Sequence, residues 1–253
     1  MSINASVYII CKNEEHHIEK VLESVKEFDE IIIVDSGSVD KTLEIAKRYT
    51  SEIFEQAWLG YAGQKEFAKN LCTHEWVLNL DADEVLSPEL KDEIIQTISE
   101  NKIDALDIKI SSMLLGKFNS QWCKYNRRVR FFRKEKGHYP TKLVHESIVI
   151  DGIIQKAKHF IFDYGTPTLS IQIEKINLYS TLRSQEKFSK HKRFSLLKLT
   201  LTFPIAFFKS YVIKRGFLNG TRGFISAMNN AYYAYLKEAK LFEKYAAIDS
   251  EAL

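Results

Sequence analysis

Short apolar runs alternate with helix-forming segments over the first hundred residues, and this alternation limits the possible folds more than any other feature of the chain. Three of the runs are almost entirely apolar, as strands buried on both faces are: VYIIC at 7–11, IIIV at 31–34 and WVLNL at 76–80. Between the first two, the apolar side chains fall on one face of a helix: Ile18, Val21, Leu22 and Val25. Strands and helices in this order predict an α/β fold, with a Rossmann-like sheet that has helices on both faces.

The pattern changes after residue 104. Residues 106–111 alternate between apolar and polar side chains, as in a half-exposed strand, and residues 129–133 and 143–150 are also expected to be extended. From about Thr168 onward the sequence has helical character. We therefore predict an α/β domain at 1–165 and a mainly helical C-terminal region at 166–253.

Carboxylates follow the ends of two predicted strands. Asp35 comes directly after IIIV, while Asp81 and Asp83 follow WVLNL, with Glu84 beside them. Ligands of such sheets lie beyond the carboxyl ends of the strands, so both acidic strand ends are expected at the same edge. Charged side chains seldom follow a buried strand so closely without a partner.

A divalent cation, Mg²⁺ or Mn²⁺, is the partner that the sequence predicts. Asp81 and Asp83 form a DxD pair that can hold the cation while the phosphates of a nucleotide diphosphate complete its shell. The same pair is compatible with a solvated turn. An EF-hand is excluded, because Val85 and Leu86 stand where that loop needs an oxygen ligand and a glycine.

Several other motifs are absent from the sequence. It has no GxGxxG, no GxxxxGK[ST] and no GxSxG, which removes support for a dinucleotide fingerprint, a P-loop and a serine hydrolase. The pair His145-Glu146 does not extend to HExxH, because Val149 stands at the fifth position. Glu146 is a candidate general base, and it is equally compatible with a surface glutamate on an edge strand.

The composition limits which binding partners and which cellular compartment we expect. A net charge of +3 gives no reason to expect a nucleic acid partner. Three cysteines without a CxxC pair argue against a disulfide framework or a zinc site and favour a reducing compartment. The N-terminus lacks the pattern of a signal peptide, so we expect a cytoplasmic protein.

The C-terminal part carries a strong excess of positive charge. Between Lys187 and Lys244, twelve basic residues stand against two acidic ones, with aromatic residues among them. This pattern favours helices that lie on an anionic membrane, and it is also compatible with ordinary amphipathic helices that have a basic solvent face. The apolar stretch 199–208 is shorter than the ~20 residues of a spanning helix, so we expect peripheral attachment rather than a crossing.

Several ordered motifs together resemble a known family. Three segments look like the opening motifs of family 2 glycosyltransferases, which have the GT-A fold: SVYIICKNEEHHIEKVLESV, EIIIVDSGSVDKT and WVLNLDADEVLSPEL. A narrower group, the lipopolysaccharide core β-1,4-glucosyltransferase-like proteins of Gram-negative bacteria, has motifs similar to GYAGQKEFAKN and VHESIVIDG. The resemblance is specific over about residues 5–165, which would then be a GT-A catalytic domain, and looser beyond.

The resemblance implies a donor site for a nucleotide sugar. It places Asp35 against the nucleotide base, with the backbone around Tyr8 flanking that base. Asn13 and Glu14 match the NE pair at the end of the first strand and would belong to the same nucleotide-sugar site. These roles are implications of the resemblance.

The same resemblance implies roles around the diphosphate. Lys65 falls where family members place a basic residue facing the diphosphate, Asp81 would lie near the ribose and donor sugar, and Asp83 would ligate the metal. Many family members carry their base in an ED or D-type motif that this sequence lacks after the DxD. Glu146 of the HE pair is the best placed substitute.

The implied reaction is an inverting transfer of a hexose from a sugar nucleotide such as UDP-glucose to a glycolipid hydroxyl, for example in the lipopolysaccharide inner core. The C-terminal region would hold the enzyme on the cytoplasmic face of the inner membrane. Three alternatives stay open. They are a nucleotidyltransferase that makes a sugar nucleotide, a non-catalytic membrane-associated protein with a degenerate transferase fold, and a transferase with a non-lipid acceptor whose C-terminal helices form a homodimer interface.

Overall fold

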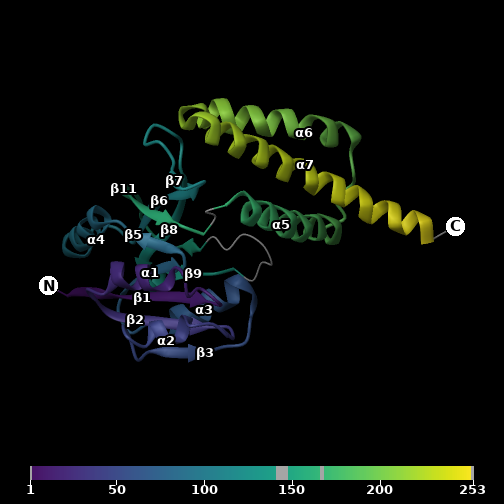
Figure 1. Cartoon of the computed structure of the whole chain (residues 1–253). Coiled ribbons are helices and arrows are strands. Elements are labelled where there is room, and N and C mark those ends of the chain that lie inside the picture. The colour runs from purple at the N-terminus through teal and green to yellow at the C-terminus, as the bar shows by residue number, and fades with distance from the viewer. Residues whose placement is uncertain (1, 141–147, 166–167, 252–253) are drawn as a thin grey trace. The chain divides into compact units, whose positions relative to one another are not determined.

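The computed structural model describes residues 2–140, 148–165 and 168–251 (Figure 1). The chain forms two compact units. The first comprises Met1–Ser112 and Asn126–Gly165, and the second comprises Met113–Tyr125 and Thr166–Leu253. The sequence indicated a division after residue 165, but it gave no sign that Met113–Tyr125 associates with the C-terminal helices.

The first unit is an α/β structure. Its strands are β1 (Ile3–Cys11), β2 (Phe28–Asp35), β3 (Ile53–Glu55), β4 (Trp76–Asp81), β5 (Glu84–Leu86), β6 (Ala105–Leu114, which ends in the second unit), β8 (Asn126–Arg133), β9 (Gly137–His138), β10 (Val149–Ile150) and β11 (Ile154–Asp163). Its helices are α1 (Ile18–Val25), α2 (Thr42–Ala46), α3 (Gly60–Leu71), α4 (Pro88–Glu100) and the 3₁₀ turn Lys134–Lys136.

The main sheet has the strand order β3-β2-β1-β4-β8-β6-β11-β5, and β7 (Lys117–Phe118) pairs with β6. Strands β3, β2, β1 and β4 are mutually parallel, whereas β8 runs antiparallel to both β4 and β6. From β1 the chain builds outward through β2 and β3, and it then returns to place β4 on the other side of β1. The carboxyl ends of β1 and β4 therefore form a topological switch point, where sheets of this kind bind ligands.

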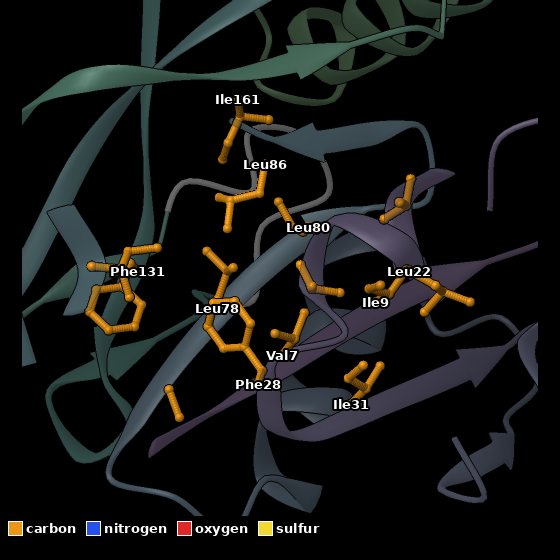
Figure 2. Packing of buried hydrophobic residues seen from close by; sticks show 14 of the residues in the cluster. Val7, Ile9, Leu22, Phe28, Ile31, Leu78, Leu80, Leu86, Phe131 and Ile161 are labelled. Carbon is orange, nitrogen blue, oxygen red and sulfur yellow. The ribbon is translucent and has the colours of Figure 1, made fainter. Parts of the chain in front are cut away.

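The two faces of the sheet have separate cores. Figure 2 shows one of them, in which Ile9 of β1 and Leu78 of β4 lie with Leu22 of α1 and Phe131 of β8. Side chains of the opposite parity, among them Val77, pack with Ala68 of α3. Helices therefore cover both faces of a mixed sheet, and the predicted fold class is confirmed.

Local sequence signals explain the helix bounds. All four apolar residues of the predicted first helix are buried in α1. Ser87 caps α4, because its hydroxyl accepts a hydrogen bond from the amide of Leu90 at 3.1 Å and Pro88 follows at the first helical position. Helix α2 is short and ends at Ala46.

The second unit is mainly helical. It contains α5 (Leu169–Ser189), α6 (Leu196–Phe208), the π-helical turn η2 (Lys209–Ile213), the 3₁₀ turn η3 (Gly216–Asn219) and α7 (Gly220–Glu251). Helix α7 packs against both α5 and α6, and Figure 1 shows α6 running beside it.

Leu196–Ile213, which comprises α6 and η2, is one continuous apolar helical stretch of 18 residues, and none of it is buried. Within the part of the chain that the structure describes, it is the one helix long and apolar enough to cross a membrane. The expectation that no segment could cross was too strict, since it measured only 199–208 and did not extend the helix past Lys198 and Lys209.

Candidate functional site

The two acidic strand ends meet on the same edge of the sheet, as the sequence predicted. Across the parallel pairs, Cys11 of β1 is in register with Asp35 of β2, and Ile10 of β1 is in register with Asp81 of β4. The two aspartates therefore flank the end of β1 at the switch point. With neighbouring strands about 4.8 Å apart, their backbones are separated by roughly 10 Å.

Asp81 is held between two cations of the protein. Its Oδ1 lies 2.8 Å from Nζ of Lys65, which reaches in from α3. Its Oδ2 lies 2.6 Å from Nη2 of Arg130, which belongs to β8. Both cationic side chains are largely buried, whereas that of Asp81 is 37% exposed. An open carboxylate with buried cations behind it is oriented for contact with a ligand.

Arg130 joins three polar side chains. Besides Asp81, its Nη2 donates to Oε1 of Glu84 at 2.6 Å, and its Nη1 donates to Oδ1 of Asn79 at 2.6 Å. The other oxygen of Glu84, Oε2, accepts from the backbone amide of Asp81 at 3.0 Å. The Nε of Arg130 is buried without a hydrogen-bond partner. The guanidinium thus fixes the positions of Asp81 and Glu84 relative to each other.

The charges of this cluster shift one another's pKa values. Burial opposes ionisation of Asp81, but Arg130 and Lys65 outweigh it and hold the Asp81 pKa well below its ordinary value. Burial raises the pKa of Glu84 to about 8, with the Asp81 carboxylate adding to the rise. Burial lowers the pKa of Arg130, but its carboxylate partners raise it further, so the net pKa lies above its ordinary value. The cluster therefore keeps two cations and the Asp81 anion at neutral pH, with Glu84 able to exchange a proton.

A buried hydrogen-bond chain continues below the cluster. Asn79 Oδ1 lies 3.4 Å from the hydroxyl of Tyr139, and that hydroxyl lies 2.7 Å from the hydroxyl of Tyr8. The Tyr8 side chain is fully buried, so any contact with a nucleotide would come from its backbone, as the resemblance implied. Its side chain supports the sheet face under the site.

Asp35 organises the loop that follows β2. Its Oδ2 accepts hydrogen bonds from the amides of Gly37 and Ser38, both at 2.8 Å, and its Oδ1 accepts one from the Ser38 hydroxyl at 2.5 Å. Gly37 adopts a φ of +95°, which suits a residue without a Cβ. This turn accounts for the buried carboxylate without a nucleotide, and a role for Asp35 at the base stays a prediction.

The predicted donor-site residues after β1 are bonded to the same loop. Asn13 has a φ of 56°, its amide donates to Ser38 Oγ at 2.9 Å, and its Oδ1 accepts from the amide of Val39 at 2.9 Å. The amide of Glu14 donates to Thr42 Oγ1 at 2.7 Å. The loops after β1 and β2 thus form one connected rim at the carboxyl edge, and their predicted part in donor binding is untested.

The sequence predicted a metal as the partner of the three clustered carboxylates, and the structure places protein cations against Asp81 and Glu84. Asp81 and Glu84 are paired with Arg130, and Asp81 also with Lys65. Among the described residues, no three His, Cys, Asp or Glu side chains are grouped as a metal site. Asp83 fits a cation as a single protein ligand, because Mg²⁺ commonly binds one or two carboxylates and completes its shell with substrate phosphates and water. The carbonyl oxygen of Asp83 accepts from the amide of Tyr164 at 2.9 Å, which anchors the turn.

Glu146, the predicted base, lies outside the described residues. The described residues on either side of that segment are adjacent, because β9 and β10 pair through His138 and Val149. Tyr139, next to β9, belongs to the hydrogen-bond chain below Asp81. The assignment of Glu146 therefore stays a prediction.

Arg130, Glu84 and Tyr139 were missed as site residues. A signal for Arg130 was present, since an arginine within the apolar strand VRFFR needs buried anionic partners. Asn79 and Asp81 are two residues apart and lie on one face of their strand, so the face that Arg130 contacts could also be inferred from the sequence. Tyr139 carried no signal, because its contact with Tyr8 spans 131 residues of sequence.

Comparison with known proteins identifies the family of this chain. Residues 6–148 match the family model described as Glycosyl transferase family 2. An uncharacterized glycosyltransferase of Rickettsia typhi is 34% identical over 94% of this chain and 86% of its own length. The lipopolysaccharide core biosynthesis glycosyltransferase LpsC of Rhizobium meliloti is also 34% identical, over 95% of this chain and 93% of its own length.

A solved structure shares the fold. The crystal structure of S. aureus TarS residues 1–349 in complex with UDP-GlcNAc matches with a TM-score of 0.50 and 16% sequence identity. The match covers 92% of this chain and 82% of that chain.

Proposed function

The chain belongs to glycosyl transferase family 2, and we propose that it transfers a hexose from a nucleotide diphosphate sugar, such as UDP-glucose, to a hydroxyl of a glycolipid acceptor with inversion at the anomeric carbon. The observation that carries the proposal is the cluster of Lys65, Asp81 and Arg130 at the switch point between β1 and β4. Buried cations beside an open carboxylate suit a ligand that has both a diphosphate and hydroxyl groups.

The donor site would combine the rim and the cluster. Asp35 and the backbone near Tyr8 would meet the base, and Asn13 and Glu14 would support the same rim. TarS, which has the same fold, holds UDP-GlcNAc in its crystal structure, and this supports a nucleotide-sugar donor. The exposed part of Asp81 would accept hydrogen bonds from ribose or donor-sugar hydroxyls while Lys65 faces the diphosphate.

Charge development explains why the cations matter. As the acceptor oxygen bonds to the anomeric carbon, the bond from that carbon to the diphosphate oxygen breaks, and the electron pair leaves with the diphosphate. Lys65 and Arg130 are held in place before the reaction, so they stabilise this charge without reorganising. A single displacement inverts the anomeric centre and needs no carboxylate nucleophile, unlike a retaining glycosidase.

A Mg²⁺ or Mn²⁺ ion on Asp83 belongs to the proposal as well. When bound, such an ion would neutralise part of the charge on the departing diphosphate. Asp81, whose two oxygens already meet cations, would contribute to the ion through its exposed edge or by changing partners.

We propose that Glu146 is the general base that removes the proton from the acceptor hydroxyl. Carboxylates just before β6 or in its first residues are weaker alternatives, because β6 runs parallel to β4 and its start lies at the opposite edge of the sheet. Asp104 there pairs with Arg133 at 3.3 Å, and Asp107 pairs with Arg127 at 2.9 Å. Both carboxylates therefore have structural roles away from the switch point.

The glycolipid acceptor rests on likeness to a protein named for lipopolysaccharide core biosynthesis, which matches nearly the whole chain. Such an acceptor lies in a membrane, so we propose a cytoplasmic enzyme held peripherally at the anionic inner leaflet. The alternative to membrane attachment is that the C-terminal helices form a homodimer interface.

The decisive experiment is a screen of nucleotide sugars for release of nucleoside diphosphate, with and without Mg²⁺ or Mn²⁺, followed by NMR of the anomeric proton in the product. One sugar nucleotide should be turned over selectively, with an inverted product. Lys65→Met should abolish donor binding, whereas Lys47→Met, on an exposed position after α2, should leave it intact. Pyrophosphate release from a nucleoside triphosphate and a sugar phosphate would show a nucleotidyltransferase instead. Donor binding without turnover would favour the non-catalytic alternative.

A further inference from the structure

Two segments far apart in sequence form one end of the second unit. We name this end the aromatic tip and define it as residues 115–124 together with residues 207–224. The second part contains the end of α6, the turns η2 and η3 and the start of α7.

Hydrogen bonds fasten the two segments of the aromatic tip. The amide of Lys124 donates to the carbonyl of Lys214 at 3.1 Å, and the amide of Ser120 donates to Oδ1 of Asn219 at 2.7 Å. The Cys123 thiol lies 3.3 Å from the carbonyl oxygen of Arg215. The loop that carries Trp122 is therefore fixed to this end of the second unit.

Aromatic packing makes the rest of the aromatic tip rigid. Phe207 stacks on Tyr211 with ring centroids 5.4 Å apart, and Phe224 meets Tyr211 edge to face at 5.9 Å. The backbone is equally tight, since a Cβ on Gly223 would lie 1.8 Å from the carbonyl oxygen of Gly216. A rigid support of this kind holds outward side chains in place.

The outward side chains of the aromatic tip are apolar. Trp122 is 64% exposed, Phe208 56% and Ile213 50%. Val212, Phe217 and Leu218 are exposed as well. Large apolar side chains that gather on one exposed end mark a docking site.

Basic residues surround these apolar side chains. Lys117, Lys124, Lys209, Lys214 and Arg215 are all exposed, and neither 115–124 nor 196–224 contains an acidic residue. Tryptophan and basic side chains are the residues that favour the membrane–water interface. Each basic residue near an anionic surface adds attraction, so the charge matches anionic lipid.

The length of the apolar helix argues for insertion into one leaflet. At ~1.5 Å per residue, the 18 residues of Leu196–Ile213 span about 27 Å, less than the ~30 Å of a hydrocarbon core. The apolar surface fits a position in the interface.

We propose that the aromatic tip is the membrane-docking surface of this protein, with Trp122 and the apolar side chains of η2 and η3 at headgroup depth in an anionic leaflet. This deepens the proposed function by naming the surface that meets the membrane of the acceptor. Residue Trp122 comes from outside the C-terminal region to which the charge pattern drew attention.

Tryptophan fluorescence provides the test. The chain has three tryptophans, of which Trp76 is buried and Trp58 can be replaced by Phe, which leaves Trp122 as the exposed reporter. Vesicles of phosphatidylcholine with phosphatidylglycerol should shift its emission to the blue with a saturable response, and pure phosphatidylcholine should do so much more weakly. Lipids brominated near the headgroup should quench it more than lipids brominated near the bilayer centre.

Two sets of variants separate charge from insertion. Replacing Lys209, Lys214 and Arg215 with Gln should weaken binding to anionic vesicles by roughly 10²-fold, at about tenfold or less per basic residue. Phe208→Ser with Ile213→Ser should also weaken binding, and should do so even at high salt. Ile153→Ser with Ile154→Ser, two exposed apolar positions of the first unit, is the matched control and should bind normally.

The outcomes against the proposal are distinct. An unchanged Trp122 spectrum on all vesicles, together with a sedimenting dimer that Phe208→Ser with Ile213→Ser dissociates, would make the aromatic tip a homodimer interface. Quenching of Trp122 only by lipid brominated in the inner leaflet of the vesicles would make α6 a crossing helix, because the aromatic tip lies at one end of α6. Release of nucleoside diphosphate from a soluble sugar nucleotide should be unaffected in every variant, so failure of the docking surface does not imply failure of the transferase assignment.

Discussion

Replacing Arg130 with Met tests whether the cluster at the strand ends is held together by this one guanidinium. The change keeps an apolar stem of similar length and removes the charge. Glu84, only 4% exposed, loses its cation, and Asn79 Oδ1 loses the closer of its two donors, whereas Asp81 keeps Lys65. Removing one partner of a buried ion pair typically costs about 3–5 kcal/mol, and we expect Arg130→Met to destabilise the protein by that amount.

A double-mutant cycle isolates the Arg130–Glu84 interaction. At pH 9, above the raised pKa of Glu84, Glu84→Gln keeps the side-chain volume and removes the stranded charge, so adding it to Arg130→Met should recover part of the loss. The coupling energy should be about 1–3 kcal/mol, as for residues in one buried network. Arg128→Met, at an exposed position of the same strand, is the control and should change stability by no more than about 0.5 kcal/mol.

Urea unfolding followed by the fluorescence of Trp76 is a suitable assay, because its ring stacks on Phe131, the neighbour of Arg130, at 4.9 Å. Donor affinity should be measured in the same variants. Additive effects of Arg130→Met and Glu84→Gln, or an Arg130→Met variant as stable as Arg128→Met, would refute the reasoning. Loss of donor affinity at unchanged stability would mean that Arg130 acts on the donor without holding the cluster together.

Four further predictions concern single groups. The folded pKa of Glu84 is raised to about 8 from 4.5, so folding takes up a proton between those pH values and wild-type stability should fall as pH rises from 4.5 to 8. In urea titrations, Glu84→Gln should lose that part of the dependence of stability on pH. Asp83→Asn should nearly abolish turnover with the fold intact; wild-type activity across metal concentrations would remove the metal assignment. Glu146→Gln should lower kcat by about 10²–10⁴-fold, remove the acid limb of the pH–rate profile and spare donor binding by calorimetry. The Cβ of Gly223→Ala would meet the Gly216 carbonyl, so this variant should disorder the aromatic tip and lower the thermal stability of the second unit. Proteolysis between the units would release the second unit for this measurement.

The sheet could be predicted from the sequence because its signals are local. The buried face of α1 follows from a spacing of three and four residues, and the cap of α4 follows from Ser87 and Pro88. The convergence of Asp35 and Asp81 follows from parallel strand order alone.

The inside of the cluster could not be predicted in the same way. Which cation meets Asp81 depends on β8 lying antiparallel beside β4, a pairing between residues about fifty positions apart that no local pattern encodes. The sequence therefore did not reveal Arg130 and Lys65 as partners of Asp81, and the metal on Asp83 stays a prediction. The turn Asp35–Ser38 was recognised, but its use of both carboxylate oxygens depends on the exact loop geometry.

The attachment of 115–124 to the C-terminal helices has a consequence for biosynthesis. Ser120 and Lys124 leave the ribosome some ninety residues before Asn219 and Lys214, the residues to which they bond. At ~5–20 residues per second, this loop waits on the order of 5–20 s for its hydrogen-bond partners, on a nascent chain whose sheet strands on either side can already pair. A chain truncated near residue 165 would leave the loop in this condition permanently. A piece of this protein that satisfies these hydrogen bonds must therefore extend to Asn219, although its sheet is complete much earlier.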